Sequence, residues 1–171
     1  NIPFQSISVN AKAKTGESPE ASARHARYQA LATLVEEDHC LLTAQHQDDQ
    51  AETFLLQLFR GAGAAGLAAM PFCDDFSNGL HMRPLLAFTQ DDILAYANHH
   101  ELNWVEDPSN KDDRYDRNYL RNQIMPLVKQ RWPVIDQTIS SVAKQQAENK
   151  QLLEYYAAAE LKHINADADS L

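Results

Sequence analysis

The sequence predicts an α/β fold in which helices flank a parallel sheet, followed by one long helix. Two observations support the first part: apolar runs short enough for strands occur at residues 4–9 and 40–44, and each precedes a segment with helical spacing of apolar side chains. The third observation is that residues 134–163 contain no Gly or Pro and carry a sparse apolar stripe. A helix of about 30 residues would extend about 45 Å, so we expect it to connect to a further domain.

The first half of the chain shows clear helix boundaries. Ser18-Pro19-Glu20 supplies an N-cap, a proline at the first helical position and an early acid, so a helix begins here. A second helix is predicted from about residue 49 to residue 60, with Gly61 ending it in a left-handed conformation. Residues 61–80 are rich in small side chains and predict a loop. An extended segment follows at residues 80–86, where Pro84 favours the edge of a sheet.

The second half begins with a capping pair, Thr89 and Asp92, for a helix that continues to about residue 102. The loop EDPSNKDDRYD follows, and its last residue, Asp116, can cap another helix that Pro126 is expected to kink or restart. We therefore expect one domain over residues 1–132 and a long linking helix over residues 133–171.

Composition is that of an ordinary soluble globular protein, with 44% hydrophobic and 23% charged residues. Cys40 and Cys73 form no C-x-x-C pair, which argues against a disulfide framework or a zinc knuckle and fits a reducing cytosol. No apolar run approaches the roughly 20 residues that span a membrane. The net charge of −9 argues against a generally basic nucleic-acid binder. Residues 111–131 nevertheless hold six bases against three acids, a patch that either contacts phosphates or is a solvated helix face.

Four polar side chains follow the run at residues 40–44: His46, Asp48, Asp49 and Glu52. In a structural interpretation Asp49 and Glu52 form a capping box, which stabilises a helix by about 1 kcal/mol, and Asp48 interacts favourably with the helix dipole. In a functional interpretation the cluster is a ligand site, because ligands bind at the carboxyl ends of parallel strands. Carboxylates there suit a magnesium ion or an ammonium group. The spacing permits both.

Three blocks of the sequence resemble bacterial tRNA(Ile)-lysidine synthetases. The blocks are AQHQDDQAETFLLQLFRGAGAAGL from Ala44, RPLL from Arg83 and, most specific, WVEDPSNKDDRYDRNYLRNQIMPL from Trp104. They occur in the family's order, over roughly residues 20–135. The resemblance implies a PP-loop domain of the adenine nucleotide α-hydrolase-like class. It also implies a reaction in which ATP adenylates C2 of the wobble cytidine of tRNA-Ile(CAU), and free L-lysine then displaces AMP to form lysidine.

One family motif does not occur in these 171 residues: the S-G-G-x-D-S loop, whose backbone amides hold pyrophosphate. The resemblance implies that this loop lies upstream of Asn1. We therefore expect the chain to be a fragment that opens in mid-strand, lacks the N-terminal strands and cannot catalyse the reaction alone. The resemblance further implies that an absent C-terminal tRNA-binding domain follows the long helix, and that the enzyme is cytoplasmic and not membrane-bound. The long helix could also serve as a homodimer surface.

The resemblance and the demands of the reaction together suggest roles. The lysine amine has an ordinary pKa of about 10.4 and must lose a proton before it attacks. The candidate catalytic residues are His46 beside the adenylate, Asp49, and Glu52 gripping the ammonium; Asp49 is also a candidate Mg²⁺ ligand. Candidates for binding ATP are Arg60 and Arg83. Candidates for binding tRNA or lysine are Asp48, Asn110, Arg117, Asn118 and Arg121.

Structural alternatives stay open for the arginines. Arg60 can satisfy the carbonyls at the end of its helix, and Asp113 and Asp116 can pair with Arg117 and Arg121 in a structural network. Three other functions also remain. A PP-loop tRNA thiolation enzyme lacks support because no paired cysteines are present. A non-catalytic tRNA-binding relic would not need the polar cluster, and a metal-dependent hydrolase would need a second histidine group.

Overall fold

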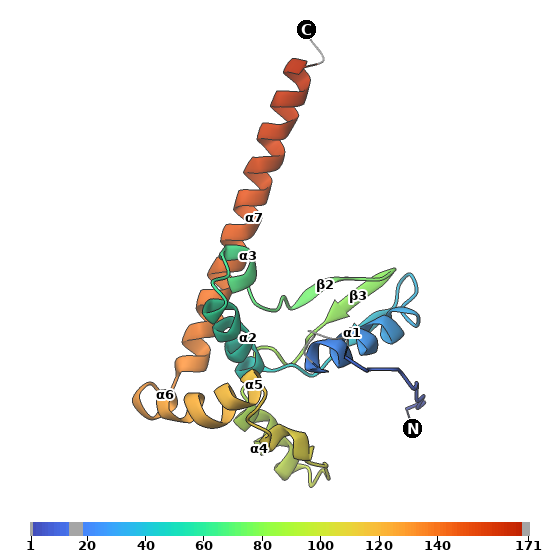
Figure 1. Cartoon of the computed structure of the whole chain (residues 1–171), viewed down its shortest axis with the longest axis vertical. Helices are drawn as coiled ribbons and strands as arrows, with labels where there is room; N and C mark the ends of the chain where they lie inside the picture. Colours follow the sequence, from blue (N-terminus) through green and yellow to red (C-terminus); the bar gives the residue numbers. More distant parts are fainter. Residues whose placement is uncertain (1, 14–18, 169–171) are drawn as a thin grey trace. The chain divides into compact units, whose positions relative to one another are not determined.

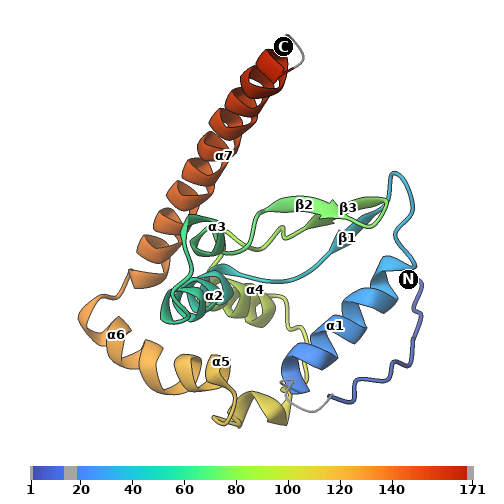
Figure 2. The same cartoon turned by 45° about the horizontal axis from the view of Figure 1, so that its top comes forward.

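The computed structural model describes residues 2–13 and 19–168. They fall into two compact units (Figures 1 and 2). The first comprises Asn1–Ala44 and Phe72–Pro84, and the second comprises Gln45–Pro71 and Leu85–Leu171. The predicted N-cap Ser18 lies outside the described residues.

Within its described residues, the first unit holds one helix and a three-stranded sheet. The elements are α1 (Pro19–Ala32), β1 (Cys40–Leu42), β2 (Cys73–Phe76) and β3 (Gly79–Met82). The strand order is β1-β3-β2, with β1 parallel and β2 antiparallel to β3. The predicted parallel pairing therefore holds for β1 and β3, and the β2–β3 hairpin makes the sheet mixed. Ser77, in the turn between the hairpin strands, has a left-handed φ of 54°.

Several sequence predictions for this unit are wrong. Residues 4–9 form no strand, because none of the described strands pairs with them, and Phe4 is 92% exposed. The run at residues 40–44 does form a strand, over Cys40–Leu42, but Leu42 is 62% exposed, so this strand is not buried. β3 is the central strand, so the predicted edge position is also wrong. Pro84 is compatible with this place because β3 ends at Met82, two residues before it.

Within its described residues, the second unit contains helices joined by turns and loops and no strand. Its elements are α2 (Gln47–Phe59), α3 (Ala64–Leu67), α4 (Gln90–His99), the 3₁₀ turn η1 (Pro108–Lys111), α5 (Asp116–Tyr119), the π-helical turn η2 (Leu120–Ile124), α6 (Met125–Arg131) and α7 (Ile135–Ala168). The prediction of a loop over residues 61–80 is wrong in two places, because a short helix (α3) and a strand (β2) form there. The predicted long helix is confirmed as α7, which has 34 residues.

The core of the second unit lies where α2 packs against α7. Its buried members are Ala51, Phe54, Leu120, Met125, Ile139 and Ala143. Pro126 falls in the first turn of α6, where its missing N–H costs no hydrogen bond, so the predicted restart of the helix is confirmed. Among the described residues, no helix combines the length and apolarity required to cross a membrane.

Candidate functional site in the second unit

The polar cluster is built on the first turn of α2. His46 is the N-cap residue, and its backbone N–H donates to Asp49 Oδ2 over 3.1 Å. Its imidazole lies between two carboxylates, with Nε2 3.3 Å from Asp49 Oδ2 and Nδ1 3.6 Å from Asp48 Oδ2. The predicted capping box of Asp49 and Glu52 is therefore wrong by three residues. Because Asp49 closes the turn with His46, Glu52 takes no part in capping.

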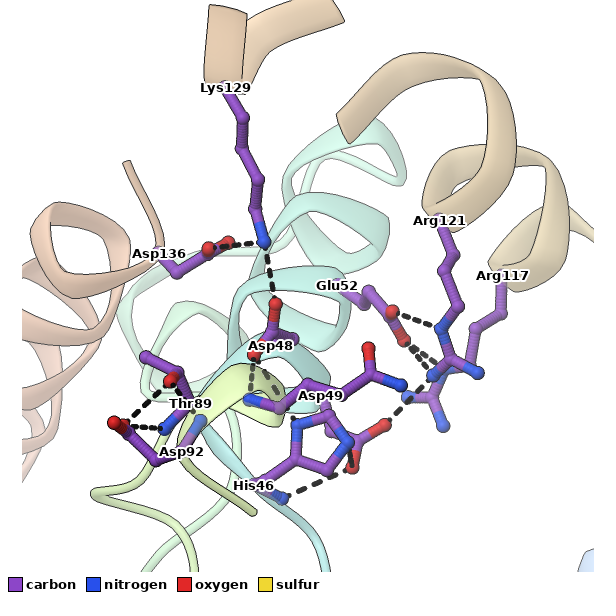
Figure 3. A network of polar contacts seen from close by, with 11 residues as sticks. His46, Asp48, Asp49, Glu52, Thr89, Asp92, Arg117, Arg121, Lys129 and Asp136 are labelled. Atoms are coloured by element: carbon purple, nitrogen blue, oxygen red, sulfur yellow. Dashed lines mark hydrogen bonds and ion pairs between the residues drawn. The ribbon is translucent and has the colours of Figure 1, made fainter. Parts of the chain in front are cut away.

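Glu52 is the charged centre of the cluster and is only 2% exposed. Arg121 binds it with two prongs, from Nε to Oε1 over 2.6 Å and from Nη2 to Oε2 over 2.7 Å (Figure 3). The same Nη2 donates to Asp49 Oδ1 over 2.9 Å. Arg117 donates to Thr53 Oγ1 over 2.7 Å and places Nε 3.6 Å from Glu52 Oε2. Two cations thus compensate one buried carboxylate.

The side chains of Arg117 and Arg121 face α2, so their ion pairs can be compared with the predicted pairing to Asp113 and Asp116. They pair with Glu52 and Asp49 instead of Asp113 and Asp116, so the predicted partners are wrong. Asp113 accepts from the amides of Asn122 and Gln123. The π-helical turn η2 contains Arg121, and wide turns of this kind are frequent at functional sites.

A second branch of the network joins the start of α2 to α6 and α7. Lys129 Nζ lies 2.6 Å from Asp48 Oδ1 and 2.6 Å from Asp136 Oδ2 (Figure 3). The other oxygen of Asp48 accepts from the backbone N–H of Gln90 at the start of α4, over 2.8 Å. Sequence reasoning missed Lys129 and Asp136 as site residues. The count of bases in residues 111–131 included Lys129, but no spacing rule relates it to an aspartate 81 residues earlier.

Burial and neighbouring charges have opposite effects on the pKa values of the residues in the cluster. Burial alone would lower the pKa of His46, but Asp48, Asp49 and Glu52 together raise it above 6.5. Burial raises the pKa of Glu52 even though Arg121 acts to lower it. Asp48 shows the opposite balance: burial favours its neutral form, but bonds from His46, Lys129 and Gln90 hold its pKa well below the ordinary value. Asp48 is therefore firmly ionised.

The structure does not bring all predicted site residues to this cluster. The Arg60 side chain is 64% exposed, and its ion pair among the described residues is with Asp116, at 3.9 Å. Asn118 ties its own loop together by donating to the carbonyls of Ser109 and Asp112. The carbonyl of Asn110 accepts from Asn122. These asparagines thus shape the loop before α5.

Arg83 belongs to the first unit and is 6% exposed. Its Nη2 lies 3.1 Å from His81 Nδ1, and His81 Nε2 lies 2.7 Å from Thr43 Oγ1. Because a guanidinium only donates, His81 Nδ1 accepts and Nε2–H donates to the threonine. Burial first, and then Arg83, lowers the pKa of His81. His81 is therefore held neutral in this unit.

Magnesium does not fit Asp49 in this arrangement. Asp49 Oδ2 accepts from the backbone of His46, and Oδ1 accepts from Arg121. Within the described ranges, no group of three or more His, Cys, Asp or Glu side chains is placed to hold a metal ion. Magnesium prefers several oxygen ligands in octahedral geometry.

A charged cluster at the start of α2, in a chain whose other unit holds a small mixed sheet and a helix, defines a protein of the α/β class with a polar site on α2. The chain belongs to the PP-loop domain family, an ATP-binding class, whose family model matches residues 1–128.

Proteins with similar sequences have names that fit an ATP-dependent PP-loop family. The chain is 50% identical to a tRNA(Ile)-lysidine synthase of Methylococcus capsulatus over 156 residues, which are 91% of the chain and 36% of that protein. It is 52% identical to a tRNA(Ile)-lysidine synthase of Photobacterium profundum over 151 residues, which are 88% of the chain and 35% of that protein. The chain thus spans about a third of the length of these relatives.

Proposed function

We propose that this chain is part of a tRNA(Ile)-lysidine synthetase. The reaction would be ATP-dependent ligation of L-lysine to C2 of the wobble cytidine of tRNA-Ile(CAU), through an adenylated intermediate. Support comes from the names of the relatives and from the three sequence blocks that resemble this family. In this proposal residues 1–132 belong to the catalytic domain and residues 133–171 form the link to a tRNA-binding domain. The enzyme would work in the cytoplasm.

One observation carries the proposal: two of the sequence blocks meet in a single charge network. Arg121, from the block that starts at Trp104, binds Asp49 and Glu52, from the block that starts at Ala44. A scaffold would not need three charged side chains placed so closely, since buried ion pairs add little stability compared with apolar packing. Such a network instead supports a preorganised polar site.

We assign the proton transfer to His46. The attacking lysine amine must become neutral, and His46 in its neutral form would take the proton, because the two carboxylates raise the pKa of the ring and stabilise the imidazolium that results. Asp49 would orient the imidazole through Oδ2 and keep Arg121 nearby through Oδ1. Glu52 is closed off by its arginines, so it would hold Arg117 and Arg121 in place instead of gripping the lysine ammonium. Their positive charge would offset negative charge that develops on the adenylated substrate.

ATP, when bound, supplies AMP as the leaving group of the activated cytidine. Of the predicted ATP-binding residues, Arg60 has an exposed side chain whose ion pair with Asp116 is long and solvent-exposed, whereas Arg83 is buried beside His81. Arg60 is therefore the better candidate. Magnesium finds no support in the geometry around Asp49, and the homodimer stays a prediction.

The test is formation of lysidine by the protein expressed from its complete reading frame. The enzyme is incubated with tRNA-Ile(CAU), ATP and isotope-labelled lysine, and the digested nucleosides are analysed by mass spectrometry. We expect labelled lysidine, a loss of about 100-fold in rate for His46→Gln, and a clear loss for Arg121→Lys, whose ammonium cannot reproduce the two-pronged bond. Lys150→Met is the control, because Lys150 is an exposed residue whose ion pair in the described part of α7 is with Glu154, at 3.7 Å.

Three results would count against the proposal. The absence of lysidine from wild-type enzyme would remove the assigned reaction. A 2-thiocytidine product in the presence of a sulfur donor would indicate the thiolation class instead. Unchanged rates for His46→Gln and Arg121→Lys, with lysidine still formed, would return the cluster to a purely structural role.

A further inference from the structure

Lys129 occupies an unusual position, because its ammonium connects three helix starts. It binds Asp48 in the first turn of α2 and Asp136 in the first turn of α7, each over 2.6 Å. Asp48 also accepts from Gln90 at the start of α4. The connection is compact: the side chains of Asp48 and Asp136 are 13% and 8% exposed.

The same carboxylate reaches the candidate proton acceptor. Asp48 binds Lys129 through Oδ1, and its Oδ2 lies 3.6 Å from His46 Nδ1. Among the described residues, Lys129 is the side-chain cation that bonds to Asp48 Oδ1. Without it, this oxygen would be left partly buried and unpaired, and the bond from Gln90 to Oδ2 would hold the carboxylate at one oxygen alone. The position of the Asp48 carboxylate beside the imidazole therefore depends on Lys129.

The charge of buried Asp136 also depends on Lys129 for its compensation. Asp136 is 6% exposed, and its Oδ1 has no hydrogen-bond partner within the described part of the chain. Its other oxygen relies on Lys129. An aspartate buried to this degree without its cation would be strongly unfavourable. The ammonium therefore fixes the first turn of α7 and the first turn of α2 at the same time.

We propose that Lys129 is a positioning residue for the site on α2: by binding Asp48 and Asp136 together, it sets the place of Asp48 beside His46 and couples the start of α7 to the site. The catalytic part of this inference rests on the proposed function. The bridge itself does not, so it has a separate readout.

The kinetic test uses Lys129→Met, which keeps the length of the side chain and removes its charge, and Lys129→Arg, which keeps the charge and can still reach both carboxylates. In the lysidine assay, at a temperature where every variant is folded, we expect Lys129→Met to lower kcat about tenfold. The KM values for ATP and lysine should change little, and Lys129→Arg should recover most of kcat. Lys150→Met is the control for loss of one lysine charge.

The second test is the sign of the Asp136→Asn effect on the thermal unfolding midpoint. In the wild-type background Asp136→Asn should lower the midpoint, because Lys129 loses a partner. In the Lys129→Met background it should raise the midpoint, because it removes a buried charge that has no cation. This reversal reports the bridge even if the reaction is a different one.

The outcomes separate the two proposals. If wild-type enzyme makes no lysidine, the proposed function fails, and the bridge is then tested by the unfolding midpoints alone. An equal drop in the midpoint when Asp136→Asn is added to wild type and to Lys129→Met would overturn the bridge. If lysidine forms and Lys129→Met keeps the wild-type kcat, the positioning role is overturned while the proposed function stands. A lower kcat that Lys129→Arg does not recover would also contradict it, since the argument depends on the charge.

Discussion

Arg121 and Glu52 are 69 residues apart in the sequence and form a two-pronged ion pair, with N–O distances of 2.6 and 2.7 Å. The carboxylate is almost completely buried, and Arg117 is a second cation at 3.6 Å. This pair joins α2 to η2. It therefore connects the helix that holds the candidate site to a turn 69 residues further along the chain.

Arg121→Met should destabilise the second unit. It leaves Glu52 buried with Arg117 alone, and breaking a buried pair of this kind costs about 3 kcal/mol. Hydrogen exchange in α2, followed by mass spectrometry, should show faster local opening. Glu52→Gln added to this variant should slow the opening again. Arg114→Met is the control, since the exposed pair of Arg114 with Asp112 should contribute nothing measurable. Equal protection in wild type and Arg121→Met would contradict the expected effect.

Gln50 should be intolerant of an apolar replacement. Its buried amide donates to the carbonyl of Met70 over 2.9 Å and accepts from the N–H of Met70 over 3.0 Å, which holds the chain after α3 against α2. Gln50→Leu leaves both backbone groups unpaired and should cost about 2–3 kcal/mol. Exchange at residues 64–71 measures this directly, with the exposed Gln145→Leu as the matched control. Unchanged exchange there would show that water replaces the amide without loss.

Gly79 should not accept a side chain. A Cβ atom at this position would lie 2.3 Å from the carbonyl oxygen of His39 and 2.8 Å from that of Glu36. Because β3 must approach this backbone closely, Gly79→Ala should separate it from the loop before β1 and cost about 1–3 kcal/mol. Gly63→Ala is the control, since a Cβ there meets nothing within 4 Å. Proteolysis between residues 36 and 82 compares the two variants, and equal cleavage would refute the expectation.

His81 should make the first unit sensitive to acid. Burial and Arg83 lower its folded pKa below 6.5, so the unfolded chain binds a proton more readily than the folded chain. The stability that neutral His81 contributes is fully present above pH 6.5 and is lost as the pH falls through its folded pKa. NMR titration should give a midpoint below that of a free histidine, with the resonance assigned by His81→Gln. Comparison of unfolding at about pH 7.5 and about pH 5.5 should show a larger acid loss for wild type than for His81→Gln. A midpoint at or above 6.5 would contradict this prediction.

Much of the helical structure could be predicted from local patterns. α2, α4 and α7 carry apolar spacing and boundary residues within their own segments, and the Thr89–Asp92 capping pair is present as expected. The strands were predicted less well. β2 contains Asp74 and Asp75 and is largely exposed, so it lacks the apolar pattern by which strands are recognised. A strand-like pattern at residues 4–9 is not sufficient, because a strand also needs a partner.

The candidate site shows the same division between local and distant information. His46, Asp48, Asp49 and Glu52 could be found because they share one short stretch of sequence. Their partners could not be assigned, because Arg121 and Lys129 reach them through tertiary packing. Local charge spacing pointed to Asp113 and Asp116 as partners for the arginines, whereas buried Glu52, which most needs a counter-charge, is their actual partner.

The wide turn η2 sets the rotational phase of everything that follows it. In a regular α-helix each residue advances the side chains by about 100°, so removing one residue turns all later side chains by that angle. η2 holds five residues between α5 and α6, with Arg117 before it and Lys129 after it. Shortening η2 by one residue would swing Lys129 away from Asp48 and Asp136 while leaving Arg117 where it is. The length of η2 thus determines whether the ion pair of Arg117 with Glu52 and those of Lys129 with Asp48 and Asp136 can form at the same time.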